Sequence, residues 1–311
     1  MGLDPNELFP EVPNLYEFPS IHAEMIYDEH RVNAYKNAIN RTVKKGDVVV
    51  DIGTGTGLLA FLCLQSGAKH VHAIDRSPII ESAKQLAKAN GYENKITFYN
   101  NDSRETEIEE KADVMVSELI GHIAFEEGMV ESLFDAKTRF VKPDGSILPE
   151  SVTLYAAPVY EKEVYQSCID CWKPVNGIDY SIMRDNALRT SYLTEISQYD
   201  LLAEHQPIFF VDFTSDIYPK IHSEKTYKIH RNGAVNGVAL WFDSCLAKNV
   251  NLSSGPWSKT HWMQCFAPIP KPIDVNMREE LFVTIDMKLR NKKEDKFSFT
   301  VDIKKKEKNA S

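Results

Sequence analysis

The chain has 311 residues, of which 43% are hydrophobic and 26% are charged, and its formal net charge is −9. This composition describes one large or two moderate globular domains, and the acidic balance disfavours a general nucleic-acid binder, whose domains are basic. No apolar run approaches the roughly 20 residues that span a bilayer, and the N-terminus lacks the basic and apolar regions of a secretory signal.

The predicted elements begin after a segment rich in proline and acids, residues 1–19, which we expect to be irregular. Residues 20–39 carry apolar side chains at helical spacing, with the serine at position 20 as the N-cap. Four further side chains follow this helix at intervals of three residues, so that each neighbours the next: His22, Met25, Asp28 and Arg31. Arg31 either binds the carboxylate of a cofactor or pairs locally with Asp28.

Strands and helices then alternate along the chain. Strands are predicted at 47–52, 70–75, 96–99 and 113–116, and helices at 58–65, 79–89 and about 129–140. Such alternation predicts an α/β fold with a parallel, doubly wound sheet. Ligands of these sheets bind at the carboxyl ends of the strands, so the loops that follow the strands are where a site is expected.

A glycine-rich loop follows the first strand, with the sequence Asp51-Ile-Gly53-Thr-Gly55-Thr-Gly57. Its glycines allow a tight turn and a close approach of the backbone to a ligand, in dinucleotide binders as well as in S-adenosylmethionine binders. Two features favour S-adenosylmethionine, namely the preceding acid and the sequence Asn101-Asp102-Ser103 after the third strand. Asp102 either accepts a hydrogen bond from the adenine amine or is a turn residue. Asp75, at the end of the second strand, is the expected acceptor for the ribose hydroxyls.

Two acids, Glu118 and Glu127, lie on the loop after the fourth strand. Carboxylates in this position can form a fork for a guanidinium group, which is planar and carries five donors. The negative net charge is compatible with steering of a cationic substrate, although on its own it indicates only solubility. The two acids therefore suggest an enzyme that acts on arginine.

The pattern changes after Pro149, where several segments alternate apolar and polar residues as strands do. Strands are predicted at 152–156, 208–213, 225–229, 238–242, 260–266, 281–285 and 297–301. They indicate an antiparallel domain, either a barrel or a sandwich. A helical or irregular segment at 163–200 interrupts it.

The five cysteines are scattered and odd in number, which fits a reducing compartment. We therefore expect a cytoplasmic location, extended to the nucleus if the protein is eukaryotic. Cys168 and Cys171 form a lone CxxC without the further ligands of a structural zinc site. We expect thiols on a helix face there, no metal, and neither a membrane nor a direct nucleic-acid partner.

Taken in order, these motifs resemble the protein arginine methyltransferases over nearly the full length of the chain. The matching segments are Ile21–Arg31, Val50–Gly57, Ser117–Met129, Lys142–Pro149, Lys173–Ser181 and Thr260-His261-Trp262. The resemblance implies an N-terminal segment with cofactor-covering helices at 1–45, a Rossmann-like S-adenosylmethionine domain at 46–149 and an antiparallel β-barrel at 150–311. It also implies a helical dimerisation arm at about 170–200, and hence a homodimer.

The resemblance further implies a role for each candidate side chain. Glu118 and Glu127 would hold the guanidinium of an arginine-containing protein or peptide, and Asp28 and His261 would pair, one of them receiving the released proton. Trp262 would either stack on the guanidinium or be an aromatic of the barrel core. The cofactor contacts would come from His22, Met25, Arg31, Asp51, Gly53, Gly55, Gly57, Asp75, Asp102 and Ser103.

The chain also departs from the family pattern. Leu119-Ile120 stands where Trp-Met is frequent, Asp75 replaces a longer glutamate, and the N-terminal aromatic motif is reduced to Tyr16 within Val12–Tyr16. Met25 together with Thr260-His261-Trp262 resembles members that form asymmetric dimethylarginine. Two alternatives stay open: a methyltransferase of free arginine or another small guanidine, and a non-catalytic regulatory partner of an active homologue.

Overall fold

The computed structural model describes residues 19–219, 222–289 and 298–306, and the chain divides into two compact units. The first unit contains the residues up to 118 and residues 135–148, and the second contains residues 119–134 and those from 149 onward. The sequence placed the whole acidic loop in the first domain, whereas residues 119–134 group with the second unit. The expectations for residues 1–18, including the Val12–Tyr16 motif, lie outside the described residues.

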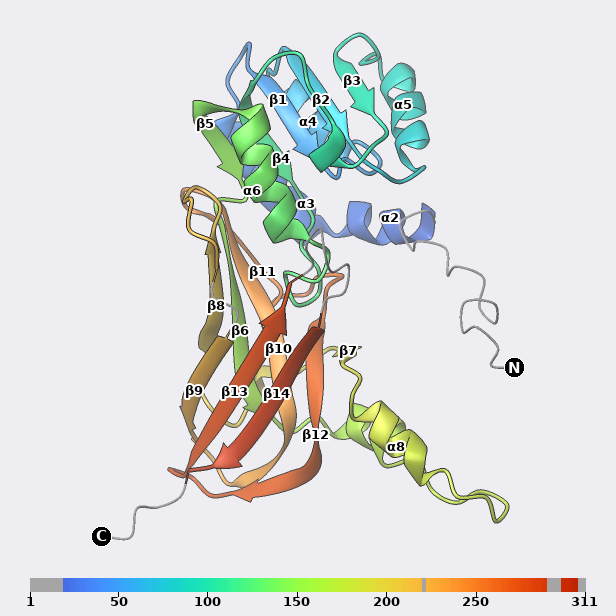
Figure 1. Ribbon diagram of the computed structural model, residues 1–311, viewed down its shortest axis with the longest axis vertical. Coiled ribbons are helices and arrows are strands. Elements are labelled where there is room, and N and C mark those ends of the chain that lie inside the picture. The colour runs from blue at the N-terminus through green and yellow to red at the C-terminus, as the bar shows by residue number, and fades with distance from the viewer. Residues whose placement is uncertain (1–18, 220–221, 290–297, 307–311) are drawn as a thin grey trace. The chain divides into compact units, whose positions relative to one another are not determined.

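The first unit contains a five-stranded parallel sheet in the order β3-β2-β1-β4-β5 (Figure 1). Its strands are β1 (Val48–Ile52), β2 (His70–Ile74), β3 (Ile96–Tyr99), β4 (Ala112–Ser117) and β5 (Val141–Leu148). The doubly wound α/β prediction is confirmed. From β1 the chain proceeds to β2 and β3 on one side of the sheet, whereas β4 and β5 lie on the other side, so the strand order reverses between β1 and β4. The loops after β1 and β4 therefore flank the crevice that such sheets use for ligands.

The helices of this part of the chain are α2 (Pro19–Tyr27), α3 (Glu29–Thr42), α4 (Leu58–Gln65), α5 (Ile80–Ala89) and α6 (Met129–Phe140). The helical spacing that begins at Ser20 corresponds to two helices, which are interrupted at Asp28. The Asp28 carboxylate accepts a hydrogen bond from the Arg31 backbone N–H at 2.9 Å and so caps α3. Ser20 lies inside α2, which begins at Pro19, a residue suited to a first turn.

The second unit contains two antiparallel sheets. The larger has the order β7-β12-β10-β6-β8, with β11 added to β10, and the smaller has the order β14-β13-β9. The strands are β6 (Ser151–Val159), β7 (Tyr192–Thr194), β8 (Gln206–Asp212), β9 (His222–Lys228), β10 (Gly233–Ala247), β11 (Val250–Ser253), β12 (Gln264–Val275), β13 (Glu280–Lys288) and β14 (Ser298–Lys305). Closure of these sheets into a barrel stays a prediction.

The predicted strand at 260–266 was wrong at its beginning, because β12 starts only at Gln264. Met263 has a φ of 53°, a left-handed conformation that an extended strand does not contain. Thr260, His261 and Trp262 therefore lie on a loop that leads into the strand, as loop-borne functional residues commonly do.

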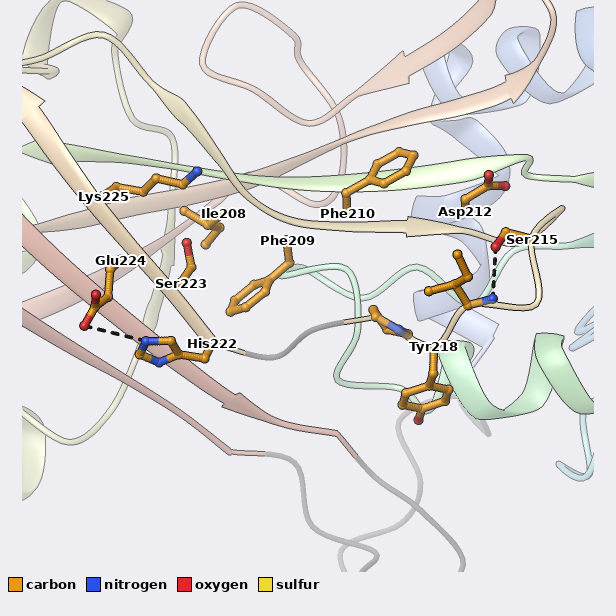
Figure 2. A pocket seen from close by; sticks show the side chains of 12 residues that line it. Ile208, Phe209, Phe210, Asp212, Ser215, Tyr218, His222, Ser223, Glu224 and Lys225 are labelled. Carbon is orange, nitrogen blue, oxygen red and sulfur yellow. Dashed lines mark hydrogen bonds and ion pairs between the residues drawn. The ribbon is translucent and has the colours of Figure 1, made fainter.

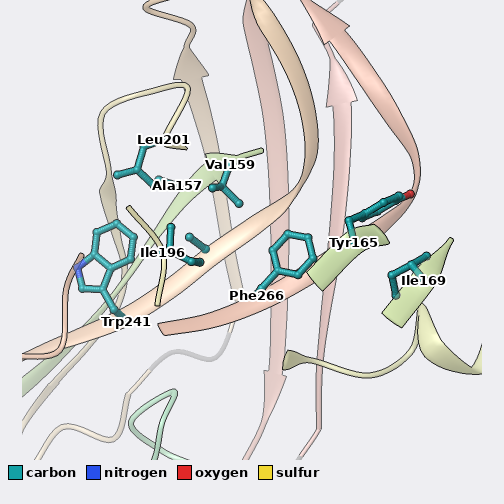
Figure 3. Close-up of a cluster of buried hydrophobic side chains, with 9 residues drawn as sticks. Ala157, Val159, Tyr165, Ile169, Ile196, Leu201, Trp241 and Phe266 are labelled. Atoms are coloured by element: carbon teal, nitrogen blue, oxygen red, sulfur yellow. The ribbon is translucent and has the colours of Figure 1, made fainter. Parts of the chain in front are cut away.

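The segment expected to form an arm contains α7 (Lys162–Val164), a π-helical turn at Tyr165–Ile169 and α8 (Ser181–Ala187). Its first part packs on one face of the larger sheet, where Tyr165 and Ile169 join a buried apolar cluster with Trp241 and Phe266 (Figure 3). Farther along, large apolar side chains are exposed: Val175, Ile178 and Ile182 at 54%, 56% and 70%. Across the described residues, no helix is long and apolar enough to cross a membrane.

Candidate active site

The glycine-rich loop leaves β1 and enters α4 through backbone conformations that suit glycine. Gly55 and Gly57 have φ angles of +54° and +88°, in the left-handed region that L side chains rarely adopt. A Cβ at Gly55 would lie 3.4 Å from the His22 ring, and one at Gly57 would lie 3.1 Å from the Phe61 ring. The loop is therefore a backbone cradle, and His22, from α2, lies against it.

Asp51, inside β1, is fully buried and keeps one oxygen without a hydrogen-bond partner. Its Oδ2 accepts from the Thr54 hydroxyl at 2.7 Å, while Oδ1 has no partner. Burial raises the pKa of Asp51 to about 7, against the lowering effect of the Thr54 hydrogen bond. A cofactor with an ammonium group would supply the missing donor. The residues present therefore fit S-adenosylmethionine, whose methionine moiety carries such a group.

Asp75 directly follows β2, and both of its carboxylate oxygens are already engaged. Oδ2 accepts from the Gly55 N–H at 2.7 Å, and Oδ1 accepts from the Ser77 N–H and hydroxyl at 2.8 Å and 2.6 Å. Because a carboxylate offers about four acceptor sites, one remains for a further donor. Contact with a ribose hydroxyl stays a prediction, and the structure adds that Asp75 also holds the glycine loop.

Asp102, after β3, is bound by Arg104. The Arg104 Nε donates to Oδ1 at 2.9 Å and a terminal nitrogen donates to Oδ2 at 2.6 Å, and these bonds hold the pKa of Asp102 down at about 2. The Arg104 backbone N–H also donates to Oδ1, so Asp102 caps a short 3₁₀ turn, Ser103–Glu105. The contacts of Asp102 are therefore those of a turn residue, and a contact with adenine stays a prediction.

Arg139, near the end of α6, was not anticipated as part of this site. It donates to the carbonyl oxygen of Thr106 at 2.6 Å, to the carbonyl oxygen of Ser103 and to the Asp135 carboxylate. These bonds fix the turn that carries Asp102 and the buried Ser103. The only trace of this role in the sequence is the i,i+4 spacing of Asp135 and Arg139.

Arg31 binds Glu118, an arrangement that neither alternative for Arg31 anticipated. The guanidinium Nε and a terminal nitrogen lie 2.8 Å and 2.7 Å from Glu118 Oε2, with side-chain exposures of 8% and 6%. Another terminal nitrogen donates to the Met25 carbonyl at 2.9 Å. Arg31 thus connects α3 and the end of α2 to the first acid of the loop after β4, and its backbone N–H donates to the Asp28 carboxylate.

Residues 119–127 are fastened to the loop that carries Thr260-His261-Trp262. The His122 ring Nδ1 lies 2.8 Å from the Trp262 carbonyl oxygen, and the Trp262 indole N–H donates to the Ile120 carbonyl at 2.7 Å. Glu126 packs on Gly121, where a Cβ would lie 2.2 Å from its carboxyl carbon, and accepts from the Ile123 N–H at 3.0 Å. The loop conformation that leads to Glu127 is therefore set by Trp262 together with His122 and Glu126, two residues for which the sequence predicted no role.

Trp262 is 2% exposed and meets the Phe242 ring edge-to-face, with ring centroids 5.0 Å apart. This packing agrees with the core alternative rather than with stacking on a guanidinium. The His261 ring lies beside it at a centroid distance of 4.0 Å. Asp28 belongs to the first unit and His261 to the second, and their pairing stays a prediction.

Replacing Trp262 by phenylalanine is expected to lower the free energy of unfolding by about 1–3 kcal/mol, because the buried hydrogen bond from the indole N–H to the Ile120 carbonyl and part of the packing on Phe242 are lost. Urea denaturation measures the change. Trp257→Phe is the matched control: Trp257 is 48% exposed, and its change is expected to stay within about 0.5 kcal/mol. Equal losses in the two variants would show that the indole hydrogen bond is not what stabilises the loop.

Other candidate features add no site residue. Cys168 and Cys171 are free thiols, and among the described residues no group of three or more His, Cys, Asp or Glu side chains could hold a metal. A groove of about 560 Å³ lies between β8 and β9, with Phe209, Phe210 and Tyr218 among its walls (Figure 2). None of the predicted site residues lines this groove.

Comparison with known proteins identifies the family. Residues 150–308 match the arginine methyltransferase oligomerization subdomain, and residues 36–150 match ribosomal protein L11 methyltransferase. The chain is 32% identical to a probable protein arginine N-methyltransferase 6 of Arabidopsis thaliana, over 89% of this chain and 75% of that protein. It is 33% identical to protein arginine N-methyltransferase 6 of Xenopus laevis, over 86% and 83% of the two chains.

The fold is also similar to a solved structure, the Trypanosoma brucei PRMT1 enzyme–prozyme heterotetrameric complex with AdoHcy. The TM-score is 0.82 at 22% sequence identity, and the similarity covers 93% of this chain and 99% of that one. From the family match and the two curated relatives, this chain belongs to the protein arginine N-methyltransferase family.

Proposed function

We propose that this protein transfers a methyl group from S-adenosylmethionine to a guanidinium nitrogen of arginine in proteins. The observation that carries the proposal is the geometry at Glu118, at the carboxyl end of β4. This carboxylate already holds a guanidinium, that of Arg31, through two N–H groups within 2.8 Å. A carboxylate that binds a planar cation here, beside the glycine loop that fits the cofactor, supports the proposal.

In the proposed reaction, the cofactor supplies an activated methyl group on a sulfonium. A nitrogen–carbon bond forms, the sulfur–carbon bond breaks, and one proton leaves the guanidinium. Arginine is a poor nucleophile because its pKa exceeds about 12, so Glu118 and Glu127 would orient the reacting nitrogen and localise positive charge away from it. Positioning of this kind can contribute roughly 7–11 kcal/mol. Either His261 or Asp28 would receive the proton.

The proposal is tested by offering labelled S-adenosylmethionine with an Arg-Gly-rich peptide and, separately, with free arginine. Label in the peptide is the expected result, with asymmetric dimethylarginine as the main product. Label only in free arginine would show that the protein methylates a small molecule rather than proteins. Cofactor binding without transfer to either acceptor would support a non-catalytic regulatory partner. A cytoplasmic location stays part of the proposal, because all five thiols are free.

We also propose a homodimer formed through the arm. The support is the exposed apolar surface at Val175, Ile178 and Ile182, because large exposed apolar side chains in a cluster mark an interface. The double variant Ile178→Glu/Ile182→Glu is expected to sediment as a monomer at micromolar concentration. Ile217→Glu, at a 79% exposed position between β8 and β9, should remain a dimer. A dimer in the arm variant would show that the interface lies elsewhere.

A further inference from the structure

Four aromatic side chains contact one another at one end of the apolar cluster under the arm. Tyr155 of β6 and Trp241 of β10 are register partners, stacked at 18° with centroids 6.4 Å apart. His205 lies 5.2 Å from Tyr155 and 5.2 Å from Trp257, and Trp257 meets Trp241 at 5.6 Å. We call these four residues the aromatic surface. Within it, Trp241 is fully buried, whereas Trp257 is 48% exposed.

A carboxylate without a complete set of partners lies next to the aromatic surface. Asp243 follows Trp241 by two residues on β10 and so projects from the same face of the sheet. Its Oδ1 is buried and has no hydrogen-bond partner. Burial raises the pKa of Asp243, and the groups that lower it are the Ser253 side chain and His205, with no lysine or arginine among them. A buried carboxylate oxygen of this kind lacks a donor.

Gly255 is what allows the aromatic surface to form. A Cβ at this position would lie 2.7 Å from the Trp257 ring and 3.0 Å from Trp241 Nε1, so Trp257 can lie over Trp241 only because the residue is glycine. The Trp241 indole N–H is also buried without an acceptor. The site therefore holds a donor and an acceptor, both buried and unsatisfied, beneath a half-exposed indole, so that a ligand reaches them only when the Trp257 ring moves aside.

This arrangement selects a cation. Aromatic faces attract cations through their quadrupoles, and the free carboxylate oxygen requires a donor. A guanidinium satisfies both conditions, since its plane stacks on an indole while its edge donates to a carboxylate. A peptide carbonyl beside it would satisfy the Trp241 N–H. An ammonium would provide the charge but not the flat face.

We propose that the aromatic surface and Asp243 bind an arginine side chain of the polypeptide substrate, as a docking site separate from the methylated arginine. The separation follows from strand geometry, because Phe242, which packs on Trp262, projects from the opposite face of β10 to Trp241 and Asp243. The identity of the partner rests on the proposed function, whereas the binding chemistry does not. Substrates with several arginines would therefore be preferred to those with one.

The test compares two peptides of equal length, one with three spaced arginines and one in which glutamine replaces two of them. In Asp243→Asn and Trp257→Leu, the KM of the three-arginine peptide is expected to rise about 5- to 10-fold, which corresponds to about 1–1.4 kcal/mol. kcat and the KM of the one-arginine peptide should not change. Phe210→Leu, a 57% exposed aromatic on β8, is the matched control and should leave both peptides unaffected.

Binding is also measured without turnover, by titrating the uniformly ¹⁵N-labelled protein with the three-arginine peptide and following the indole N–H signals. The indole signals of Trp241 and Trp257 are assigned from their absence in Trp241→Phe and Trp257→Leu. Both signals are expected to shift in the wild type but not in Asp243→Asn. A shift without methyl transfer would leave the docking site standing and overturn the proposed function. Unshifted signals, or equal KM changes for the two peptides, would overturn the docking site.

Discussion

Glu118→Gln is expected to reduce both methyl transfer and stability, and Glu127→Gln is expected to reduce methyl transfer. Stability falls in Glu118→Gln because Glu118 neutralises the buried Arg31 guanidinium, with side-chain exposures of 6% and 8%. Removing one partner of a buried pair leaves an uncompensated charge and costs about 3–5 kcal/mol. For both variants, loss of an oriented carboxylate at the reacting group should lower kcat on the order of a hundred- to a thousand-fold, by analogy with other electrostatic groups.

The measurements are urea unfolding, calorimetric titration with S-adenosylmethionine and methyl transfer to a peptide. Glu127→Gln should retain the cofactor affinity of the wild type. Arg31→Gln/Glu118→Gln removes both charges and should recover part of the stability lost in the single variant. Strong residual turnover in Glu127→Gln would remove this residue from the guanidinium clamp. An unchanged stability of Glu118→Gln would mean that the ion pair with Arg31 is not needed by the fold.

The parallel sheet and the positions of its functional loops could be predicted because their signals are local. β1 is buried at all five positions and is followed at once by glycines, and β4 leads directly to Glu118. By contrast, β5 was missed, because Pro143 and the glycine at 145 within Val141–Leu148 are typical of a turn. Its pairing with β4 overrides the local preference.

The partners of the site residues could not be predicted, because they lie far apart in the sequence. The Arg31–Glu118 bond spans 87 positions, and the bonds that join Trp262 to His122 and Ile120 span 140 and 142. No periodicity encodes such pairs. Trp262 illustrates the consequence, since its residue type fits either a guanidinium platform or a core position, and only its burial distinguishes the two.

A second large effect is expected on the pH dependence of the unfolding free energy. Burial raises the pKa of Asp51 from 3.8 to about 7 in the folded protein, so the native state holds this proton more tightly than the unfolded chain does. The resulting stabilisation is complete below about pH 4, is lost as the pH rises to about 7, and stays lost above that. At about 1.36 kcal/mol per pKa unit, the loss is on the order of 4 kcal/mol. The asparagine in Asp51→Asn cannot titrate, so this variant should not show the pH-dependent loss of stability.

The quantity to measure is therefore the difference in unfolding free energy between the wild type and Asp51→Asn, from pH 4 to pH 8, because other titrating groups cancel in that difference. The wild type should lose stability relative to the variant as the pH rises, and a constant difference would contradict the raised pKa. A cationic cofactor reverses the preference, since it favours the ionised carboxylate. S-adenosylmethionine should accordingly bind the wild type more tightly at pH 8 than at pH 6. At pH 8, the Asp51→Asn variant should bind S-adenosylmethionine more weakly than the wild type does, and its affinity should depend less on pH. These two results would place the unpartnered Oδ1 of Asp51 at the cofactor.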